Sequence, residues 1–152
     1  KRSTVEIGTS YENLSRDVLS SLFPGMTLDR VGGAHDGGID LRGWWLPSTE
    51  PMRIRVIVQC KAESKKSGPV HLRELHGAYT AQPRAAAAAA AAAAGEEAAG
   101  TQVGVLVSKT GFSKQATIVA TAASIPMILV HLSELGEPVS ILCNEALTQL
   151  LD

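Results

Sequence analysis

The sequence lacks three features that would assign it to a class at once. Its net charge is −1, which rules out a globally basic nucleic-acid binder. No window approaches the roughly 20 apolar residues of a membrane span. The only cysteines, Cys60 and Cys143, lack metal-ligand spacing and lie in apolar runs, so we expect both to be buried small side chains. Two thiols suit a reducing compartment at least as well as a disulfide.

An initial methionine is also missing, and the chain begins Lys1-Arg2. We therefore expect a trimmed or mature form, with any targeting peptide outside this stretch. A chain of 152 residues has the size of one domain and buries about two-thirds of its unfolded surface. Residues 85–100 are rich in alanine, which favours helix but offers no amphipathic pattern and no reactive side chain. We expect a single domain over residues 1–152, with an Ala-rich insertion or linker at 85–100.

The chain has no net positive charge, but part of its positive charge is concentrated in one segment. Between residues 53 and 73 the only acidic residue is Glu63. Phosphate contacts need such a local footprint and not a high overall pI. A solvated loop of lysines is the alternative interpretation of this segment. The cations are Arg53, Arg55, Lys61, Lys65, Lys66 and Arg73.

A strand signature is present at residues 54–61, where β-branched side chains alternate with others. Side chains two residues apart leave a strand on the same side. Gln59 and Lys61 should therefore project together, with Arg55 behind them. Cys60 and the valines of the run should face the other way.

A glycine loop precedes this strand. Gly37-Gly38 permits a tight or left-handed backbone, so another strand can begin directly after it. Ile39 and Leu41 are then expected on one face and Asp40 on the other. If the two strands pair as a hairpin, one face gathers a carboxylate, an amide and an ammonium from Asp40, Gln59 and Lys61.

These residues resemble a known family. The motif Gly-Gly-x-x-Asp-x-Gly-Ile-Asp at residues 32–40, followed by Gln59-x-Lys61, resembles the Mrr-like branch of the PD-(D/E)xK restriction-endonuclease superfamily. The segment Gly8-Thr9-Ser10-Tyr11-Glu12 resembles the opening of the family's first helix. Arg73-Glu74-Leu75-x-Gly77-Ala78 resembles the helix after the catalytic strand. With residues 103–108 and 112–114, the resemblance covers most of the chain. The Arg-Glu-Leu helix and residues 124–144 look most like the fungal mitochondrial proteins required for respiratory growth.

The resemblance implies a fold, an activity and a location. The fold is α/β, a restriction-endonuclease-like core with a central mixed sheet flanked by helices in the order α-β-β-β-α-β-α-β. The activity is hydrolysis of DNA phosphodiester bonds with Mg²⁺ or Mn²⁺ as cofactor. The location is the mitochondrion, with a role in mitochondrial DNA maintenance. Whether the chain acts as a homodimer is left open.

The resemblance also implies roles for individual residues. Asp40 would be the central metal ligand, and the Gln59 side chain and the backbone carbonyl of Cys60 would complete the inner shell or hold its waters. Lys61 would orient the attacking water and neutralise developing charge. Glu12 would hold metal-bound water or a second ion; alternatively, Thr9 and Glu12 form a capping box and Glu12 only caps its own helix. Phosphates further along the DNA would contact Lys65, Lys66, Arg73 and Arg55.

Gln59 departs from the commonest superfamily pattern, in which a Glu or Asp stands at this position. The lost negative charge should weaken metal affinity, but Mrr-like members carry Gln here as a rule. Asp36 in the glycine loop is interpreted as a turn-forming aspartate, which leaves Asp40 as the metal carboxylate. Two alternatives stay open: a module of the same fold that binds nucleic acid without cutting it, and a scaffold whose glycine-rich hairpin is only a tight turn.

Periodicity predicts the other elements. A helix capped by Thr9 ends at Pro24-Gly25, a strand follows at residues 26–31, and Pro69 begins a helix that packs on the sheet. The C-terminal half predicts a parallel βαβ unit and then an edge strand. Its elements are strands at 103–107 and 125–132 around a helix capped by Ser113, an edge strand at 139–142 and a helix capped by Asn144.

Overall fold

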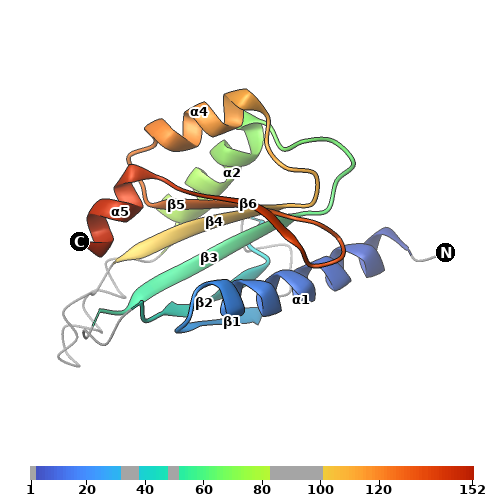
Figure 1. The fold of residues 1–152 in the computed structure, drawn as a ribbon, viewed down its shortest axis with the longest axis horizontal. Helices are drawn as coiled ribbons and strands as arrows, with labels where there is room; N and C mark the ends of the chain where they lie inside the picture. Colours follow the sequence, from blue (N-terminus) through green and yellow to red (C-terminus); the bar gives the residue numbers. More distant parts are fainter. Residues whose placement is uncertain (1–2, 32–37, 48–51, 83–100) are drawn as a thin grey trace.

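The computed structural model describes residues 3–31, 38–47, 52–82 and 101–152. These residues form a six-stranded sheet with helices on both faces (Figure 1). The strands, in both chain and spatial order, are β1 (Met26–Arg30), β2 (Leu41–Trp45), β3 (Ile54–Lys61), β4 (Gln102–Ser108), β5 (Met127–Leu132) and β6 (Pro138–Cys143). The helices are α1 (Thr4–Leu22), α2 (Pro69–Thr80), α4 (Lys114–Ala122) and α5 (Glu145–Leu151).

The sheet is mixed, as predicted. β1, β2 and β3 form an antiparallel meander, β3 to β5 run parallel, and β6 pairs antiparallel to β5 at the edge. α4 connects the parallel strands β4 and β5, which confirms the predicted βαβ unit. Ser113 and Asn144 cap α4 and α5 through their side chains, also as predicted. The predicted α/β class and order of elements are therefore confirmed.

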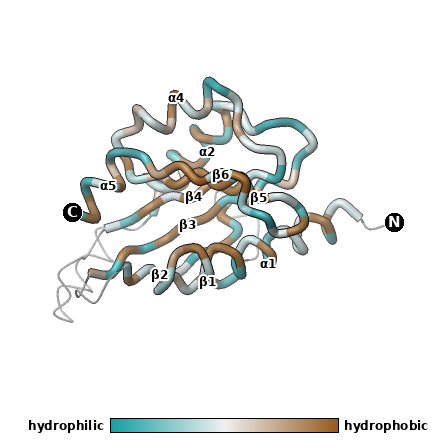
Figure 2. Tube along the Cα trace, in the orientation of Figure 1, coloured by the Kyte–Doolittle hydropathy of each residue, from teal (hydrophilic) through white to brown (hydrophobic). Residues whose placement is uncertain are grey.

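Each face of the sheet has its own hydrophobic cluster, and the central strands are the most hydrophobic part of the trace (Figure 2). Val56 and Val58 pack with Leu19 on the α1 side. Ile57 packs with Leu72 on the side of α2 and α4. This alternation confirms the predicted faces of residues 54–61, because neighbours in β3 belong to opposite clusters.

The predicted start of the first helix is wrong. α1 begins at Thr4, with Ser3 as its N-cap; the Ser3 hydroxyl accepts the N–H of Glu6 at 3.1 Å, and the Glu6 carboxylate accepts the N–H of Ser3 at 3.3 Å. The sequence holds two capping-box patterns six residues apart, and the upstream one starts the helix because Gly8, which lies between them, disfavours helix by only about 1 kcal/mol relative to alanine and is tolerated inside α1. Thr9 and Glu12 thus lie inside α1, and the carboxylate of Glu12 caps nothing.

Cys143 is a second correction. It is exposed on the edge strand β6, whereas Cys60 is partly buried, and both thiols are free. An apolar run at a sheet edge leaves side chains in solvent that a central strand would cover. The Ala-rich stretch at 85–100 and Asp36 lie outside the described residues. Within the described part of the chain, no helix has the length and hydropathy to cross a membrane.

Candidate active site

Asp40 directly precedes β2, at a point where two residues on the β2 side face a single residue of β3. Leu41 is the register partner of Val58, yet the N–H of Asp40 also donates to the carbonyl of Val58 at 2.8 Å. Two residues facing one is the geometry of a β-bulge, which redirects side chains. Ile39 accordingly packs on the α2 side and Leu41 on the α1 side. The prediction that Ile39 and Leu41 share a face is therefore wrong.

The Asp40 carboxylate is hydrogen-bonded to the backbone at the end of β3. Its Oδ2 accepts the backbone N–H of Cys60 at 2.7 Å. The N–H and C=O of one strand residue point toward the same neighbouring strand. The carbonyl of Cys60 therefore faces the same edge as Asp40. The Cys60 thiol packs on the α1-side cluster, where burial and then the charge of Asp40 raise its pKa. The backbone of Cys60 belongs to the site, and its side chain belongs to the core.

Glu12 approaches the same point from α1. The pKa of Asp40 is raised to about 6, chiefly by burial and also by the adjacent Glu12 carboxylate, while the N–H of Cys60 and the Lys61 charge act to lower it. Glu12 is held in place by Arg30, whose Nε donates to its Oε1 at 2.9 Å, and its side chain is only 19% exposed. Two carboxylates are thus kept close together in a partly buried position.

Such a pair fits a divalent cation. A buried carboxylate whose pKa is raised in part by a neighbouring carboxylate gains from a positive ion between the two. Mg²⁺ prefers one or two carboxylates, with water and substrate phosphate completing its shell. Among the described residues, no three His, Cys, Asp or Glu side chains gather as a metal cluster. Asp40, Glu12 and the Cys60 carbonyl are a donor set of the size that Mg²⁺ uses.

Gln59 leaves β3 on the face opposite to Cys60 and is fully buried. It lies against Gly38, where an added Cβ would stand 2.8 Å from Nε2 of Gln59. Gly38 also has a φ of +84°, which other residues rarely adopt. Glycine is therefore required at this position both for the turn and for the space that Gln59 occupies beside the Asp40 segment.

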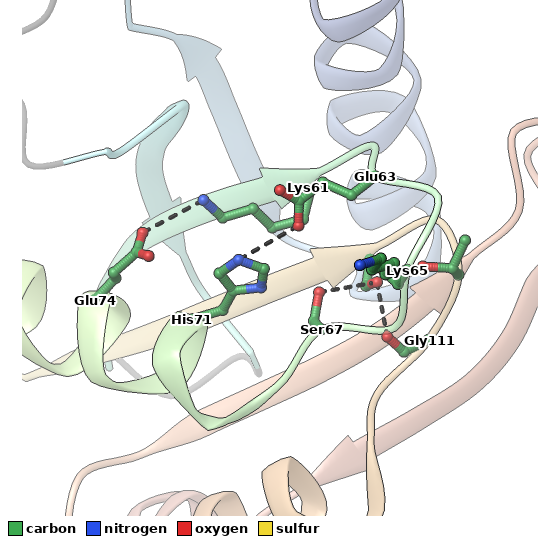
Figure 3. Close-up of polar contacts among 9 residues, drawn as sticks. Lys61, Glu63, Lys65, Ser67, His71, Glu74 and Gly111 are labelled. Carbon is green, nitrogen blue, oxygen red and sulfur yellow. Dashed lines mark hydrogen bonds and ion pairs between the residues drawn. The ribbon is translucent and has the colours of Figure 1, made fainter.

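Lys61 extends toward α2. Its Nζ lies 3.4 Å from Oε2 of Glu74, and one turn earlier Nε2 of His71 lies 3.3 Å from Oε1 of Glu63 (Figure 3). Sequence reasoning missed Glu74 as a neighbour of Lys61, because the contact depends on how α2 docks on the sheet. Its place in the Arg-Glu-Leu segment was the only signal that could have indicated it.

Lys65 and Lys66 are exposed on the loop that follows β3. The loop is anchored at two points. The N–H of Ser67 donates to the carbonyl of Gly111 at 2.9 Å, and the hydroxyl of Thr110 donates to the carbonyl of Lys65 at 2.6 Å. The hydroxyl of Ser67 also donates to the hydroxyl of Ser108 at 3.1 Å, which donates to the carbonyl of Gly111 at 2.8 Å (Figure 3). These bonds fix the backbone from which both lysines project, a few residues beyond Lys61.

The two predicted DNA-contacting arginines lie elsewhere. Arg73 is exposed on α2 and lines a groove toward α4 with Val119 and Met127. Arg55 lies six residues before Lys61 in β3, roughly 20 Å away at the rise of a strand. Its guanidinium carbon is 5.6 Å from the ring centroid of Trp44. The structure thus gathers Asp40, Glu12, Gln59 and Lys61 at one end of β3 but places Arg73 and Arg55 apart from them.

Comparison with known sequences identifies relatives. A family model described as restriction endonuclease (Mrr_cat) matches residues 7–138. The mitochondrial protein C824.03c of Schizosaccharomyces pombe is 37% identical, with 53% of this chain and 32% of the relative aligned. The mitochondrial Required for respiratory growth protein 7 of Saccharomyces cerevisiae is 31% identical, with 52% of this chain and 49% of the relative aligned. The chain thus spans at most about half the length of these relatives.

Two solved structures are similar in fold. One is the restriction endonuclease MspJI in complex with a 27-mer oligonucleotide, with a TM-score of 0.52, 18% identity and coverage of 79% of this chain and 25% of that one. The other is the DNA modification-dependent restriction endonuclease AspBHI, with a TM-score of 0.52, 18% identity and coverage of 85% and 35%. At this identity the likeness shows a shared restriction-endonuclease fold.

Proposed function

Because the chain belongs to the Mrr_cat family of restriction endonucleases, we propose that it is a metal-dependent nuclease that hydrolyses DNA phosphodiester bonds. The observation that carries the proposal is the meeting of two carboxylates and an ammonium at the end of β3. Asp40 is bound to the backbone of Cys60 at 2.7 Å, and its pKa responds to both Glu12 and Lys61. A phosphate entering this edge would find acceptors for a cation and a positive charge side by side.

Each residue would have a distinct part in hydrolysis. Asp40, Glu12 and the carbonyl of Cys60 would hold a divalent ion. A bound ion of this kind polarises the phosphate and lowers the pKa of its bound water. Lys61 would orient the attacking water and offset the negative charge that develops on the phosphate oxygens. Gln59, packed against Gly38, would keep the Asp40 segment in place or supply its amide oxygen to the ion.

DNA would enter along the anchored loop after β3. Lys65 and Lys66 project into solvent from a backbone fixed by Ser67 and Thr110, so they would contact phosphates next to the scissile one. Such contacts add affinity that depends on salt but not on base sequence. The relatives in both yeasts carry mitochondrial names, which supports a mitochondrial location and a role in mitochondrial DNA maintenance.

Two observations favour a second candidate, a nucleic-acid-binding module that does not cut. Gln59 contributes an amide where a carboxylate is common, and it is fully buried. Lys61, moreover, lies beside Glu74 at 3.4 Å. Weak metal affinity combined with an engaged lysine would leave binding without turnover.

The two functions are separated by incubating the purified chain with Mg²⁺ or Mn²⁺ and supercoiled, linear duplex and single-stranded DNA, with RNA in parallel. The proposal expects metal-dependent cleavage of at least one DNA form, abolished by EDTA and by Lys61→Ala. Binding of all these forms without cleavage at any metal concentration would establish the module instead. Cleavage of RNA alone would overturn the assignment to DNA.

A further inference from the structure

A second polar cluster occupies the far end of β2 and β3. Trp44 and Arg55 are register partners, so their side chains share a face of the sheet. Arg42, two residues before Trp44, lies on that face opposite Ile57, a member of the α2-side cluster. Arg42, Trp44 and Arg55 keep part of their surface in solvent, whereas Trp45 on the other face is buried.

The cluster gathers like charges around an indole. The guanidinium carbon of Arg53 lies 3.9 Å from the ring centroid of Trp44, and that of Arg55 lies at 5.6 Å. Burial, and then the nearby charge of Arg42, lower the pKa of Arg55, so the two guanidiniums lie close enough to repel each other. We call Arg42, Trp44, Arg53 and Arg55 the Trp44 cluster.

No carboxylate compensates Arg42 and Arg55 within the part of the chain that the structure describes. Neither forms an ion pair there, and Nε of Arg42 is buried without a hydrogen-bond partner among those residues. Asp29 is the register partner of Arg42 on β1, yet no ion pair joins them. Opposite charges are normally interspersed on a protein surface, and a group of like charges signals a partner of the other sign.

The partner must be an anion with many charges. A symmetric contact between two copies of the chain would set these same arginines against each other, because both copies use the same surface patch in an isologous interface. Guanidinium groups bind phosphate through paired N–H donors, and their contact with an indole face leaves those donor edges exposed. Rigid guanidiniums on adjacent strands therefore suit a phosphate backbone better than a single small anion.

We propose that the Trp44 cluster is a second phosphate-binding surface, which holds the DNA backbone at a distance from the point of cleavage. The proposal rests on the proposed nuclease function for its choice of DNA. Arg55 stands roughly 20 Å from Lys61 along β3. Since duplex DNA rises about 3.4 Å per base pair, the cluster would contact phosphates roughly six base pairs from the scissile one.

Binding is measured without divalent metal, with the double variant Arg42→Gln and Arg55→Gln, on hairpin duplexes from about 4 to 30 base pairs over a salt series. The slope of log affinity against log salt should fall by about 2 on long duplexes, because two phosphate contacts are lost. The effect should disappear on the shortest duplexes, which cannot reach both ends of β3. Arg16→Gln, on α1 and thus on the other face, should leave the slope unchanged. Arg42→Lys with Arg55→Lys should restore it.

An unchanged slope for the double glutamine variant on long DNA overturns the proposal. Equal competition by polyglutamate and by duplex DNA would overturn the assignment to nucleic acid. The result is independent of cleavage. If the parent chain cuts no DNA but the double glutamine variant binds DNA more weakly, the phosphate-binding surface is supported and the nuclease function is refuted. If the parent chain cuts DNA but the double variant binds as tightly as the parent, the nuclease function is supported and the phosphate-binding surface is refuted.

Discussion

At the Lys61 end of β3 the lysine and the Glu12 carboxylate each lie beside a side chain of opposite charge, whereas at the Arg55 end like charges face one another. Lys61 lies beside Glu74, and Glu12 beside Arg30. At the other end, Arg42 and Arg55 repel each other across Trp44, with no carboxylate bound to either within the described residues. The ion pairs at the Lys61 end, which we call the paired end of β3, hold its groups in fixed positions, as catalysis requires. The Arg55 end attracts a polyanion, which binding requires.

The size of these interactions supports that division. Surface ion pairs such as Lys61–Glu74 contribute only about 0–1 kcal/mol to stability, so this pair matters more for position than for folding. Holding the carboxylates of Asp40 and Glu12 close together costs folding free energy, since burial and like charge both raise the pKa of Asp40. Substitutions at the paired, Lys61 end of β3 should therefore change rates, and substitutions at the Arg55 end should change affinity.

The largest effect is expected for Asp40→Asn. The amide can still accept the N–H of Cys60 and donate to Glu12, so the fold is kept while a negative metal ligand is lost. We expect the single-turnover rate at saturating DNA to fall at least about 100-fold. Asp17→Asn, which changes an exposed carboxylate of α1 that pairs with Arg16, is the matched control and should cut at the parent rate. Full activity of Asp40→Asn would move the metal site to another carboxylate, Asp36 first.

Lys61→Gln should lower the saturating rate by about 100-fold while leaving the dissociation constant for DNA nearly unchanged, because its charge acts mainly in the transition state. Lys65→Gln with Lys66→Gln should behave in the opposite way. Affinity should drop and the salt slope should fall by about 2, but the rate at saturating DNA should be kept. Binding curves at several salt concentrations and single-turnover rates test both. Loss of affinity alone in Lys61→Gln would refute its catalytic role.

Glu12→Gln should have an intermediate effect, lowering the rate by about 10-fold, because Glu12 supports the ion beside Asp40 rather than binding it alone. Glu6→Gln, on the same helix but in its capping box, should leave the rate unchanged and affect only stability. Single-turnover measurements at several Mg²⁺ concentrations decide the point. If both variants cut equally fast, Glu12 has no part in the site.

Stability should respond to pH through Asp40. Its pKa of about 6 in the folded chain lies above the ordinary value of 3.8, so the folded state binds more protons between these values. The stability contributed by protonated Asp40 is full below about pH 4 and is lost as the pH rises through about 6. In urea unfolding with EDTA, Asp40→Asn should exceed the parent by about 1 kcal/mol at pH 8, allowing for partial exposure, and match it near pH 4. A constant difference across this range would contradict the burial argument.

The smallest effect is expected for Trp44→Leu. Loss of the indole removes the contact that orients Arg53 and Arg55, worth roughly 0.5–1 kcal/mol at an exposed site. Affinity for long DNA should therefore weaken about threefold, and Trp44→Phe should recover part of it. The rate at saturating DNA should be unaffected by either change. A fall in that rate would show that the two ends of β3 are not separate in function.

The alternation of residues 54–61 was enough to predict β3 and the face of each side chain, because period-two burial needs no tertiary information. The glycine motif likewise indicated that Asp40 would approach the end of that strand. The bulge at Asp40 could not be predicted, since it depends on a hydrogen bond to Val58 and on pairing across the hairpin. Nor could the true helix start at Ser3, because two capping patterns competed for the same helix.

Long-range neighbours also escaped prediction. Glu74 meets Lys61 only because α2 docks across the sheet, and no spacing rule links positions 13 residues apart through a loop. Arg42 lies outside the basic run at residues 53–73, so composition gave no reason to place it beside Arg55. The antiparallel register of β2 and β3 makes them neighbours. Local pattern thus predicted the elements, while the pairing of strands and the docking of helices decided the charge environments.

The most direct test is the single-turnover rate at saturating duplex DNA with Mg²⁺, measured for the parent chain, for Lys61→Gln and for the double variant Arg42→Gln with Arg55→Gln. We predict that the parent and the arginine variant cut at the same rate and that Lys61→Gln is slower by about 100-fold. A Lys61→Gln chain that cuts as fast as its parent, or a parent with no metal-dependent rate, would contradict the assignment of the paired end of β3 as the hydrolytic site.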